Sequence, residues 1–163
     1  MPTPTYTLID SVTLTSSASS VTFSSIDQTY GDLILTWETK VTASYSYVQV
    51  KLNADGGNNY SIVYMAGTGS TATSSSSSGG GFYPTQQTYP EATSTSFGSL
   101  EFMDYSATDK HKSILSRSNN TSLATQASAF RWANTAAITT IEFATPLQTM
   151  AVGANFYLWG IAK

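Results

Sequence analysis

The chain has 163 residues, of which 40% are hydrophobic, 12% are aromatic and only 10% are charged. This length fits one domain with a sizeable core, and the hydrophobic content excludes a disordered chain. The net charge is −3 and the seven Lys and Arg residues are scattered. Nucleic acid is therefore excluded as a partner, because neutralising phosphates requires clustered cations. The chain contains no cysteine, which excludes disulfides and thiolate metal sites.

The first residues, MPTPTYTLIDSVTL, lack a cationic segment followed by an apolar run, so we expect no signal peptide. No stretch approaches the ~18 apolar residues that span a membrane, and we expect no membrane partner. Asn-x-Ser/Thr sequons occur at Asn59, Asn119 and Asn120. We interpret them as chance in a chain so rich in Ser and Thr.

Alternation of apolar and polar residues is the main structural signal, and it predicts about ten β-strands. In YVQVKL, for example, Val48, Val50 and Leu52 share one face, while Gln49 and Lys51 share the other. In chain order, the predicted strands cover residues 6–14, 20–26, 32–40, 47–52, 60–66, 99–105, 112–118, 127–132, 138–144 and 155–161. Many short strands at this spacing indicate an all-β sandwich or barrel.

The segment NADGGNNY, residues 53–60, separates two of these strands. Its dipeptides Asp55-Gly56 and Gly57-Asn58 favour backbone conformations with positive φ. The sequence therefore predicts that strands 47–52 and 60–66 form a hairpin with a short loop.

The run TGSTATSSSSSGGGFYP, residues 68–84, raises the question of one domain or two. Halves of the chain would have thin cores without cysteine or metal. The ending FYLWGI is apolar on both faces and needs neighbours above and below it. We therefore predict one domain over residues 1–163, with a flexible Ser/Gly-rich loop insertion at about residues 67–96.

Catalytic and metal chemistry find little support in the sequence. The single histidine, His111, lies in the polar segment DKHKS, and no G-x-S-x-G motif accompanies the many serines. The acid pairs Asp104 with Asp109 and Asp27 with Asp32 lie in or beside turns, where Asp caps backbone N–H groups.

The three glycine-rich segments, residues 53–59, 67–70 and 79–81, also lack a recognisable ligand motif. NADGGNN departs from a calcium loop at Asn58 and Tyr64, where Gly and Glu are required. The glycines at 67–70 and 79–81 lack the Lys and helix of a phosphate loop. We predict no catalytic, cofactor-binding or metal-binding residues. Several of the ten tyrosines can serve as interface anchors or sugar-stacking surfaces, namely Tyr45, Tyr47, Tyr83 and Tyr89.

Five segments follow one another in a distinctive order: YTLIDSVTLTSSASSVTFSSIDQTYGDLILTW, VQVKLNADGGNNYS, KHKSILSRSNN, WANTAAITTIEF and ANFYLWGI. Together they resemble a group of small tailed-phage virion proteins that is common in cyanophages and marine phages. The resemblance spans nearly the whole chain except residues 67–96. It implies a two-sheet antiparallel β-sandwich of jelly-roll type and a virion structural role, as a capsid decoration (cement) protein or a fibre part.

We therefore expect a non-enzymatic capsid decoration protein that binds the major capsid protein and stabilises the head. It would be made in the host cytoplasm, sit on the capsid exterior and form a homotrimer or dimer. The N-terminal segment and the loop tips are the expected contacts with the shell. The alternative is a receptor- or carbohydrate-binding module of a tail or head fibre, with a host surface glycan as its ligand.

Overall fold

The computed structural model describes residues 4–163, so the first three residues of the expected N-terminal contact segment lie outside the described part. Within it, no helix is long and apolar enough to cross a membrane. Eleven β-strands are present: β1 (Tyr6–Thr13), β2 (Ser20–Phe23), β3 (Asp32–Thr39), β4 (Gln49–Leu52), β5 (Tyr60–Gly67), β6 (Ala72–Gly79), β7 (Ser96–Met103), β8 (Lys112–Asn120), β9 (Ala124–Trp132), β10 (Ile141–Ala144) and β11 (Asn155–Ile161).

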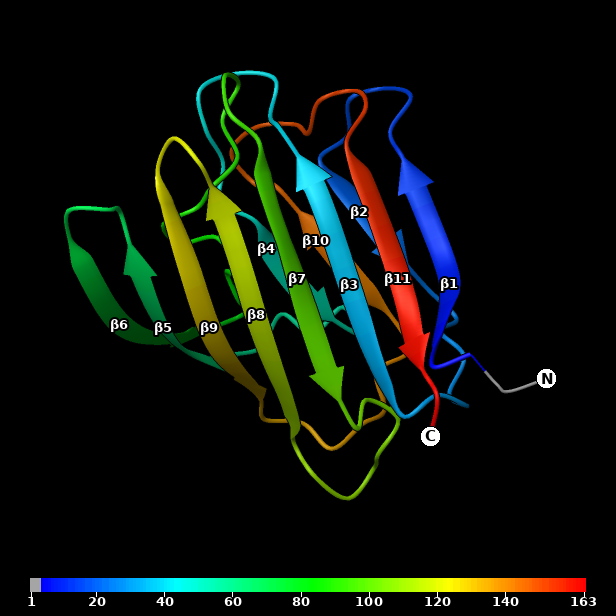
Figure 1. Ribbon diagram of the computed structural model, residues 1–163. Coiled ribbons are helices and arrows are strands. Elements are labelled where there is room, and N and C mark those ends of the chain that lie inside the picture. Colours follow the sequence, from blue (N-terminus) through cyan, green and yellow to red (C-terminus); the bar gives the residue numbers. More distant parts are fainter. Residues whose placement is uncertain (1–3) are drawn as a thin grey trace.

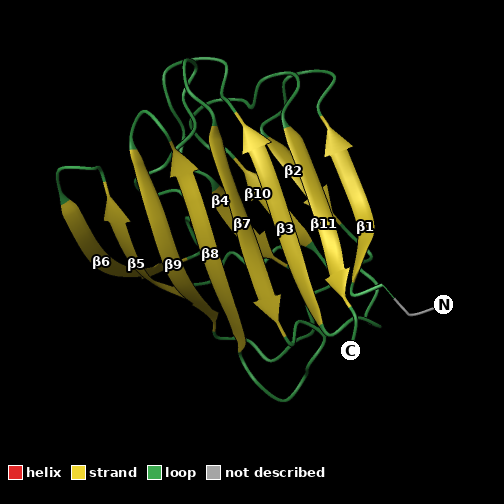
Figure 2. Cartoon of the chain, viewed as in Figure 1, coloured by secondary structure: helices red, strands yellow, loops and turns green. Residues whose placement is uncertain are grey.

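The strands form a two-sheet antiparallel β-sandwich of jelly-roll type, as predicted (Figures 1 and 2). The larger sheet has eight strands in the order β1-β11-β3-β7-β8-β9-β5-β6, and the smaller has three in the order β2-β10-β4. Each of the ten predicted strands overlaps an observed one, and β6 is the eleventh. In both sheets, strands from before and after the serine run lie side by side, so one sandwich is built from both halves of the chain.

Alternating side chains of the two sheets meet in one core. Leu33, Leu35 and Trp37 of β3 are buried on one face, and Val50 and Leu52 of β4, which the sequence places on a common face, lie in the same core from the smaller sheet. Fully burying one such side chain contributes about 1.5–3 kcal/mol. The core thus supplies the stability that a chain without disulfides needs.

The predicted hairpin between residues 47–52 and 60–66 is wrong. β4 pairs with β10 in the smaller sheet, whereas β5 pairs with β9 and β6 in the larger sheet. The intervening loop therefore crosses from one layer to the other. Its positive-φ residues are Asn53 and Ala54 rather than the glycines. Asn53 holds this conformation because its Oδ1 accepts hydrogen bonds from the backbone N–H groups of Thr139 and Thr140.

The segment 67–96, expected as one long loop, contains a strand and a docked connection. β6 continues the larger sheet beside β5 in unbroken register, from Tyr60 opposite Gly79 to Gly67 opposite Ala72. Residues 80–95, which we call the strap, then run back over the inner face of the larger sheet. Phe82 of the strap is 1% exposed and lies 4.5 Å from Phe130, measured between ring centroids. A buried aromatic ring thus anchors the segment.

Polar side chains of β8 and β9 attach the rest of the strap. Ser118 Oγ donates to Pro84 O at 2.8 Å, and Gln126 Oε1 accepts from Gln87 N at 2.8 Å. Asn120 donates through Nδ2 to Tyr89 O at 2.9 Å. These side chains are buried, and their pairing satisfies polar groups that would otherwise be costly.

We expect Asn120→Ala to lower the free energy of unfolding by about 1–3 kcal/mol, because buried partners lose their hydrogen bonds. Asn120 Nδ2 also donates to Ser94 Oγ, and Asn120 Oδ1 accepts from Ser122 N. Urea unfolding of the wild type and of Asn120→Ala measures the difference in the free energy of unfolding. Asn119→Ala is the matched control, since Asn119 is the exposed neighbour on the opposite face. An equal loss in both variants would show that the strap contacts contribute nothing.

A candidate binding groove on the outer face of the eight-stranded sheet

The eight-stranded sheet has an inner face, covered by the smaller sheet and the strap, and an outer face that is open to solvent (Figure 1). On β9, buried and exposed residues alternate without interruption. Ala127 and Ala129 are two of the exposed residues, so the middle of this strand presents only methyl groups outward.

Larger side chains stand on both sides of these alanines. Ala129 lies between Val63 of β5 and Leu115 of β8 in the register of the sheet. Ala127 lies in the same way between Met65 and Arg117. Because side chains directly opposite one another on a sheet are neighbours, the small residues form the floor of a groove and the large ones form its walls.

The groove is an open hollow of about 480 Å³, lined mainly by apolar atoms. Its apolar walls are well exposed: Val63 is 62%, Met65 is 66% and Leu115 is 43% accessible to solvent. Isolated exposed apolar residues are ordinary, but a contiguous group around a hollow marks an interaction surface. This group is the strongest candidate for a binding site in the described part of the chain.

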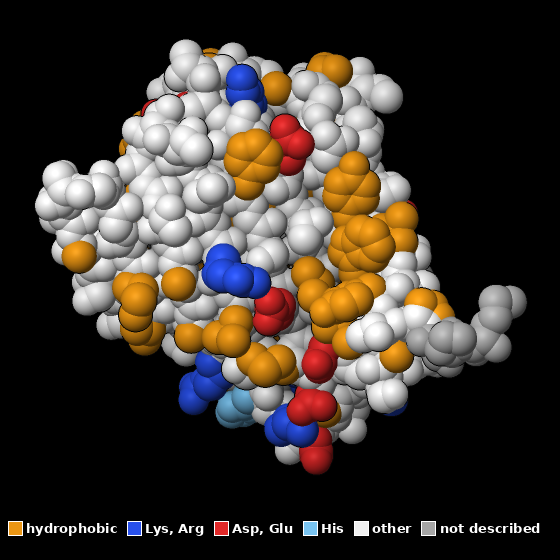
Figure 3. Space-filling model, viewed as in Figure 1, with side chains coloured by type: hydrophobic (Ala, Val, Ile, Leu, Met, Phe, Trp, Pro, Cys, Tyr) orange, Lys and Arg blue, Asp and Glu red, His pale blue; other side chains and the backbone are white. Residues whose placement is uncertain are grey.

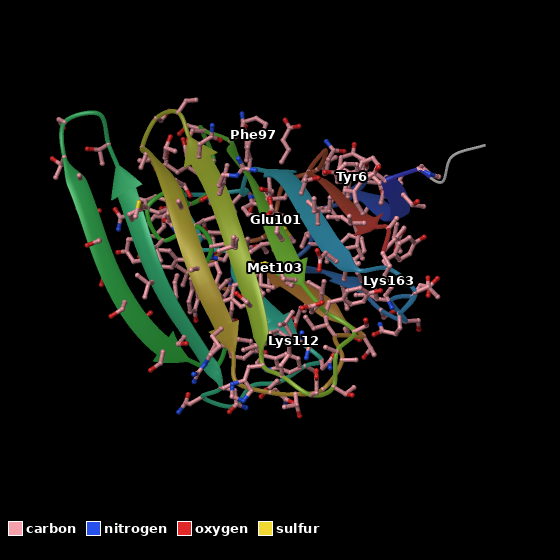
Figure 4. All side chains as sticks on the ribbon, turned by 60° about the horizontal axis from the view of Figure 1, so that its bottom comes forward. Tyr6, Phe97, Glu101, Met103, Lys112 and Lys163 are labelled. Atoms are coloured by element: carbon pink, nitrogen blue, oxygen red, sulfur yellow. The ribbon has the colours of Figure 1, made fainter. Side chains whose placement is uncertain are left out.

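One ion pair borders the groove on the side of β7. Arg117 Nη2 lies 3.5 Å from Glu101 Oε1, and the side chains are 79% and 40% exposed, respectively. Figure 4 marks Glu101 between Phe97 and Met103 along β7. A pair this exposed contributes little to stability. Its use is orientation, because it places one cation and one anion at the rim of an apolar surface.

A second apolar area lies on the same face near the opposite edge. Tyr6 and Leu8 of β1 are exposed beside Tyr157 and Trp159 of β11, whose ring centroids lie 6.5 Å apart. Figure 3 shows hydrophobic side chains gathered over β11 and β1 and again over the lower parts of β5, β9 and β8, with a cation and an anion between the two groups. The outer face is therefore apolar at both sides and charged in the middle.

Three of the four tyrosines singled out from the sequence come together at the end of the sandwich where β3 ends. The Tyr45 ring centroid lies 5.7 Å from that of Tyr47 and 4.9 Å from that of Tyr89. Burial, and then the neighbouring Tyr45, raise the pKa of the Tyr47 hydroxyl. Tyr83 lies apart from them, and its hydroxyl accepts a hydrogen bond from Gln49 Nε2 at 2.8 Å.

Three of the four acidic residues in the two pairs are hydrogen bonded. Asp27 Oδ1 accepts from Thr29 N at 3.0 Å and Asp32 Oδ1 accepts from Asp104 N at 2.7 Å, which confirms their predicted capping role. Asp104 instead pairs with Lys110, whose Nζ lies 2.9 Å from Asp104 Oδ2. That carboxylate raises the pKa of Lys110.

His111, which the sequence places in a polar segment, is exposed in the connection between β7 and β8, and Asp109 of the same connection is also exposed. Beside them, Lys112 is a buried cation that the sequence pattern did not single out. Its Nζ donates to the carbonyl oxygens of Lys110 and Thr135, and burial lowers its pKa. These contacts hold two loops together.

Asp55 lies in the segment NADGGNN that was compared with a calcium loop, and its carboxylate oxygens accept hydrogen bonds from nearby side chains and backbone. The donors are Trp132 Nε1 at 2.8 Å, Asn59 Nδ2 at 2.9 Å and Gly57 N at 2.8 Å. The bond from Trp132, followed by that from Asn59, lowers the pKa of this carboxyl. Among residues 4–163, no group of three or more His, Cys, Asp or Glu is placed to hold a metal ion.

Comparison with known proteins adds only remote likenesses. No protein-family model and no curated protein matches the chain. Among solved structures, the galectin LEC-6 from Caenorhabditis elegans is similar at 10% identity over 94% of this chain and 96% of that chain, with a TM-score of 0.39. An exo-inulinase from Aspergillus awamori is similar at 12% identity over 96% of this chain and 29% of that chain, with a TM-score of 0.41. We therefore infer function from this chain's own surface.

Proposed function

We propose that this chain is a non-enzymatic virion structural protein that decorates a phage capsid. In this proposal it binds the major capsid protein through the groove along β9, in place of the N-terminal segment and loop tips expected from the sequence, and stabilises the head. The observation that carries the proposal is the groove itself: a contiguous, solvent-exposed apolar surface formed by Val63, Met65, Leu115, Ala127 and Ala129.

The chemistry of the groove favours a protein surface as its ligand. Three of its four walls, Val63, Met65 and Leu115, are aliphatic, and protein interfaces bury an apolar centre within a polar rim. Arg117 and Glu101 supply such a rim on one side. Because the charged residues that line the groove are this one ion pair, attachment would depend little on salt, which suits a protein that must stay bound to an assembled shell.

The phage part of the proposal rests on the ordered resemblance of five segments to small virion proteins. Under this proposal the protein is made in the host cytoplasm and is found on the exterior of the capsid. Its partners are the major capsid protein and further copies of itself, since decoration proteins occupy symmetry positions.

A binding assay on capsids of the encoding phage that lack this protein tests the proposal. We expect the purified protein to bind these capsids, and we expect Ala129→Lys to weaken binding at least about tenfold, the equivalent of ~1.4 kcal/mol. The substitution fills the floor of the groove with a charged chain, while the exposed position spares the core.

Thr22→Lys is the matched control, because Thr22 is exposed on β2 in the other sheet. It adds the same charge to the opposite layer and should leave binding unchanged. Capsids that bind no wild-type protein would contradict the decoration role. Equal binding by Ala129→Lys and the wild type would contradict the groove as the attachment surface.

The cluster of Tyr45, Tyr47 and Tyr89 favours a second candidate, a carbohydrate-binding module of a fibre. Tyr45 is 39% exposed and presents an aromatic ring at the loop end of the sandwich, where a sugar could stack. A glycan array tests this candidate. Binding that Tyr45→Ala abolishes would support it, whereas no binding by the wild type would exclude it.

A further inference from the structure

The two edges of the eight-stranded sheet differ in their protection. β1, at one edge, is interrupted by a bulge between Leu8 and Asp10, and Asp10 Oδ1 accepts the backbone N–H of Ser11 at 2.7 Å. Bulges and charges are the usual means of preventing strand addition at an edge. β6, at the other edge, consists of ATSSSSSG and has no charge, no proline and no bulge.

The backbone groups on the free side of β6 can be assigned from the alternation of an antiparallel ladder. Thr68 N donates to Thr71 O in the turn, and Ala133 N donates to Asn59 O at the other side of β5. Both bonds indicate the same alternation, in which every second residue of β5 hydrogen bonds to β6 and the residues between them hydrogen bond to β9. The residues whose N–H and C=O groups point away from β5 are therefore Ala72, Ser74, Ser76 and Ser78.

Packing against the core does not explain this strand. Every residue from Ala72 to Ser78 is exposed, and the short side chains bury no apolar surface on either face. Serine also has no special preference for strands. Figure 1 shows β6 at the rim of the sheet with no element beyond it. An eight-residue strand with a free, uncharged edge is a template for pairing with another strand.

We propose that β6 pairs antiparallel with β6 of a second copy of this chain and forms a continuous sheet across a two-fold axis. A twofold interface brings each residue opposite a residue of the same surface, so charges on the strand would repel one another, and β6 has none. The register centred on Ser75 uses every free backbone group, because it sets Ala72 opposite Ser78 of the partner subunit and Ser74 opposite Ser76 of the partner subunit.

The geometry of this dimer places both grooves on one side. The two-fold axis of an antiparallel strand pair is perpendicular to the sheet, so the outer faces of the two copies form one surface. If the proposed function holds, two grooves on one surface allow bivalent attachment. Strand pairing alone buries less area than a standard permanent interface, so the dimer should depend on protein concentration.

Sedimentation over a concentration series tests the pairing. We expect the wild type to dimerise reversibly and Ser76→Pro to raise the dimer dissociation constant at least tenfold. Proline removes an N–H that points away from β5, so the fold is retained. Ser76→Ala is the matched control, because it keeps the N–H and should dimerise like the wild type.

Cross-linking tests the register. The chain has no cysteine, so Ser75→Cys introduces a single thiol that faces its own copy across the axis, in a non-hydrogen-bonded pair about 4.5 Å apart between Cα atoms. We expect this variant to form a disulfide dimer under mild oxidation and Ser77→Cys to form far less. A wild type that stays monomeric at every concentration would overturn the proposal, as would a dimer unaffected by Ser76→Pro.

The outcomes also separate this proposal from the proposed function. If the wild type is monomeric but Ser76→Pro reduces capsid binding, β6 accepts a strand of another protein, and the second-copy proposal is wrong. If the wild type dimerises through β6 and binds no capsid, the pairing holds and the decoration role is wrong.

Discussion

Replacing Trp132 by Ala is expected to lower the free energy of unfolding by about 3–5 kcal/mol, the range for removing a buried aromatic side chain. Trp132 is fully buried and lies nearly parallel to Tyr60, with ring centroids 6.4 Å apart. It also donates through Nε1 to Asp55 at 2.8 Å. The substitution therefore removes core packing and releases the loop that crosses between the sheets. Urea unfolding measures the loss.

Trp132→Phe separates the hydrogen bond from the packing, because it keeps an aromatic ring. The bond from Trp132 is the main reason why the pKa of Asp55 is lowered. A lowered folded-state pKa means that the stabilisation is fully present above the unfolded pKa, about 3.9, and is lost as the pH falls through the folded value. We therefore expect Trp132→Phe to be more destabilising at neutral pH than in acid.

Trp159→Phe is the control for this measurement, since Trp159 lies half-buried on the outer face of β11. Trp159→Phe should lower the free energy of unfolding less than Trp132→Phe does, and by the same amount at neutral and acidic pH. If Trp132→Phe lost the same stability at neutral and acidic pH, the contact with Asp55 would contribute nothing. The hydrogen bond that the Tyr60 hydroxyl accepts from Leu52 N at 3.0 Å would then be the main contact that holds this loop. Burial of the hydroxyl raises the pKa of Tyr60 to about 12, so it stays protonated throughout.

The strands could be predicted from the sequence because burial on one face of a sheet makes apolar and polar residues alternate along each strand. Val50 and Leu52 alternate with Gln49 and Lys51, and the structure buries the first pair completely. No local sequence pattern indicates which of the two sheets a strand belongs to. β4 and β5 are joined by a short loop with turn residues, yet they belong to different layers, because strand pairing is decided by residues distant in the chain.

The serine run was interpreted as a loop since its composition carries no apolar alternation. β6 takes its extended conformation from the neighbouring β5, which presents a row of backbone partners. The strap was missed for a related reason. Its attachment depends on polar residues of β8 and β9 that face inward, such as Ser118 and Gln126, and polar residues in a strand are normally assigned to the solvent side.

The groove could not be found from the sequence at all. Ala127 and Ala129 are unremarkable in a strand, and they become a floor only because the register sets Val63, Met65 and Leu115 beside them. The sequence did identify the tyrosines as candidate binding residues. Their residue type marked them as candidates, and the fold brought Tyr45, Tyr47 and Tyr89 together while leaving Tyr83 apart.

Gly98→Ala is the second substitution with a large expected effect, about 2–3 kcal/mol of lost stability from overpacking. Gly98 lies opposite Trp37 in the pairing of β7 with β3. A methyl group there would meet the Trp37 ring well inside van der Waals contact and would lie 2.8 Å from Arg117 O. Trp37 cannot move away easily, because it is buried and packs on Phe143 with ring centroids 5.4 Å apart.

Gly67→Ala is the matched control, because it places the same methyl group at the end of β5, where no atom lies within 4 Å of it. That variant should be as stable as the wild type or slightly more so, since alanine loses less backbone entropy on folding than glycine. Thermal unfolding of both variants gives the comparison. Equal stability of Gly98→Ala and Gly67→Ala would show that the added methyl group does not clash with the Trp37 ring, and the steric account of Gly98 would be wrong.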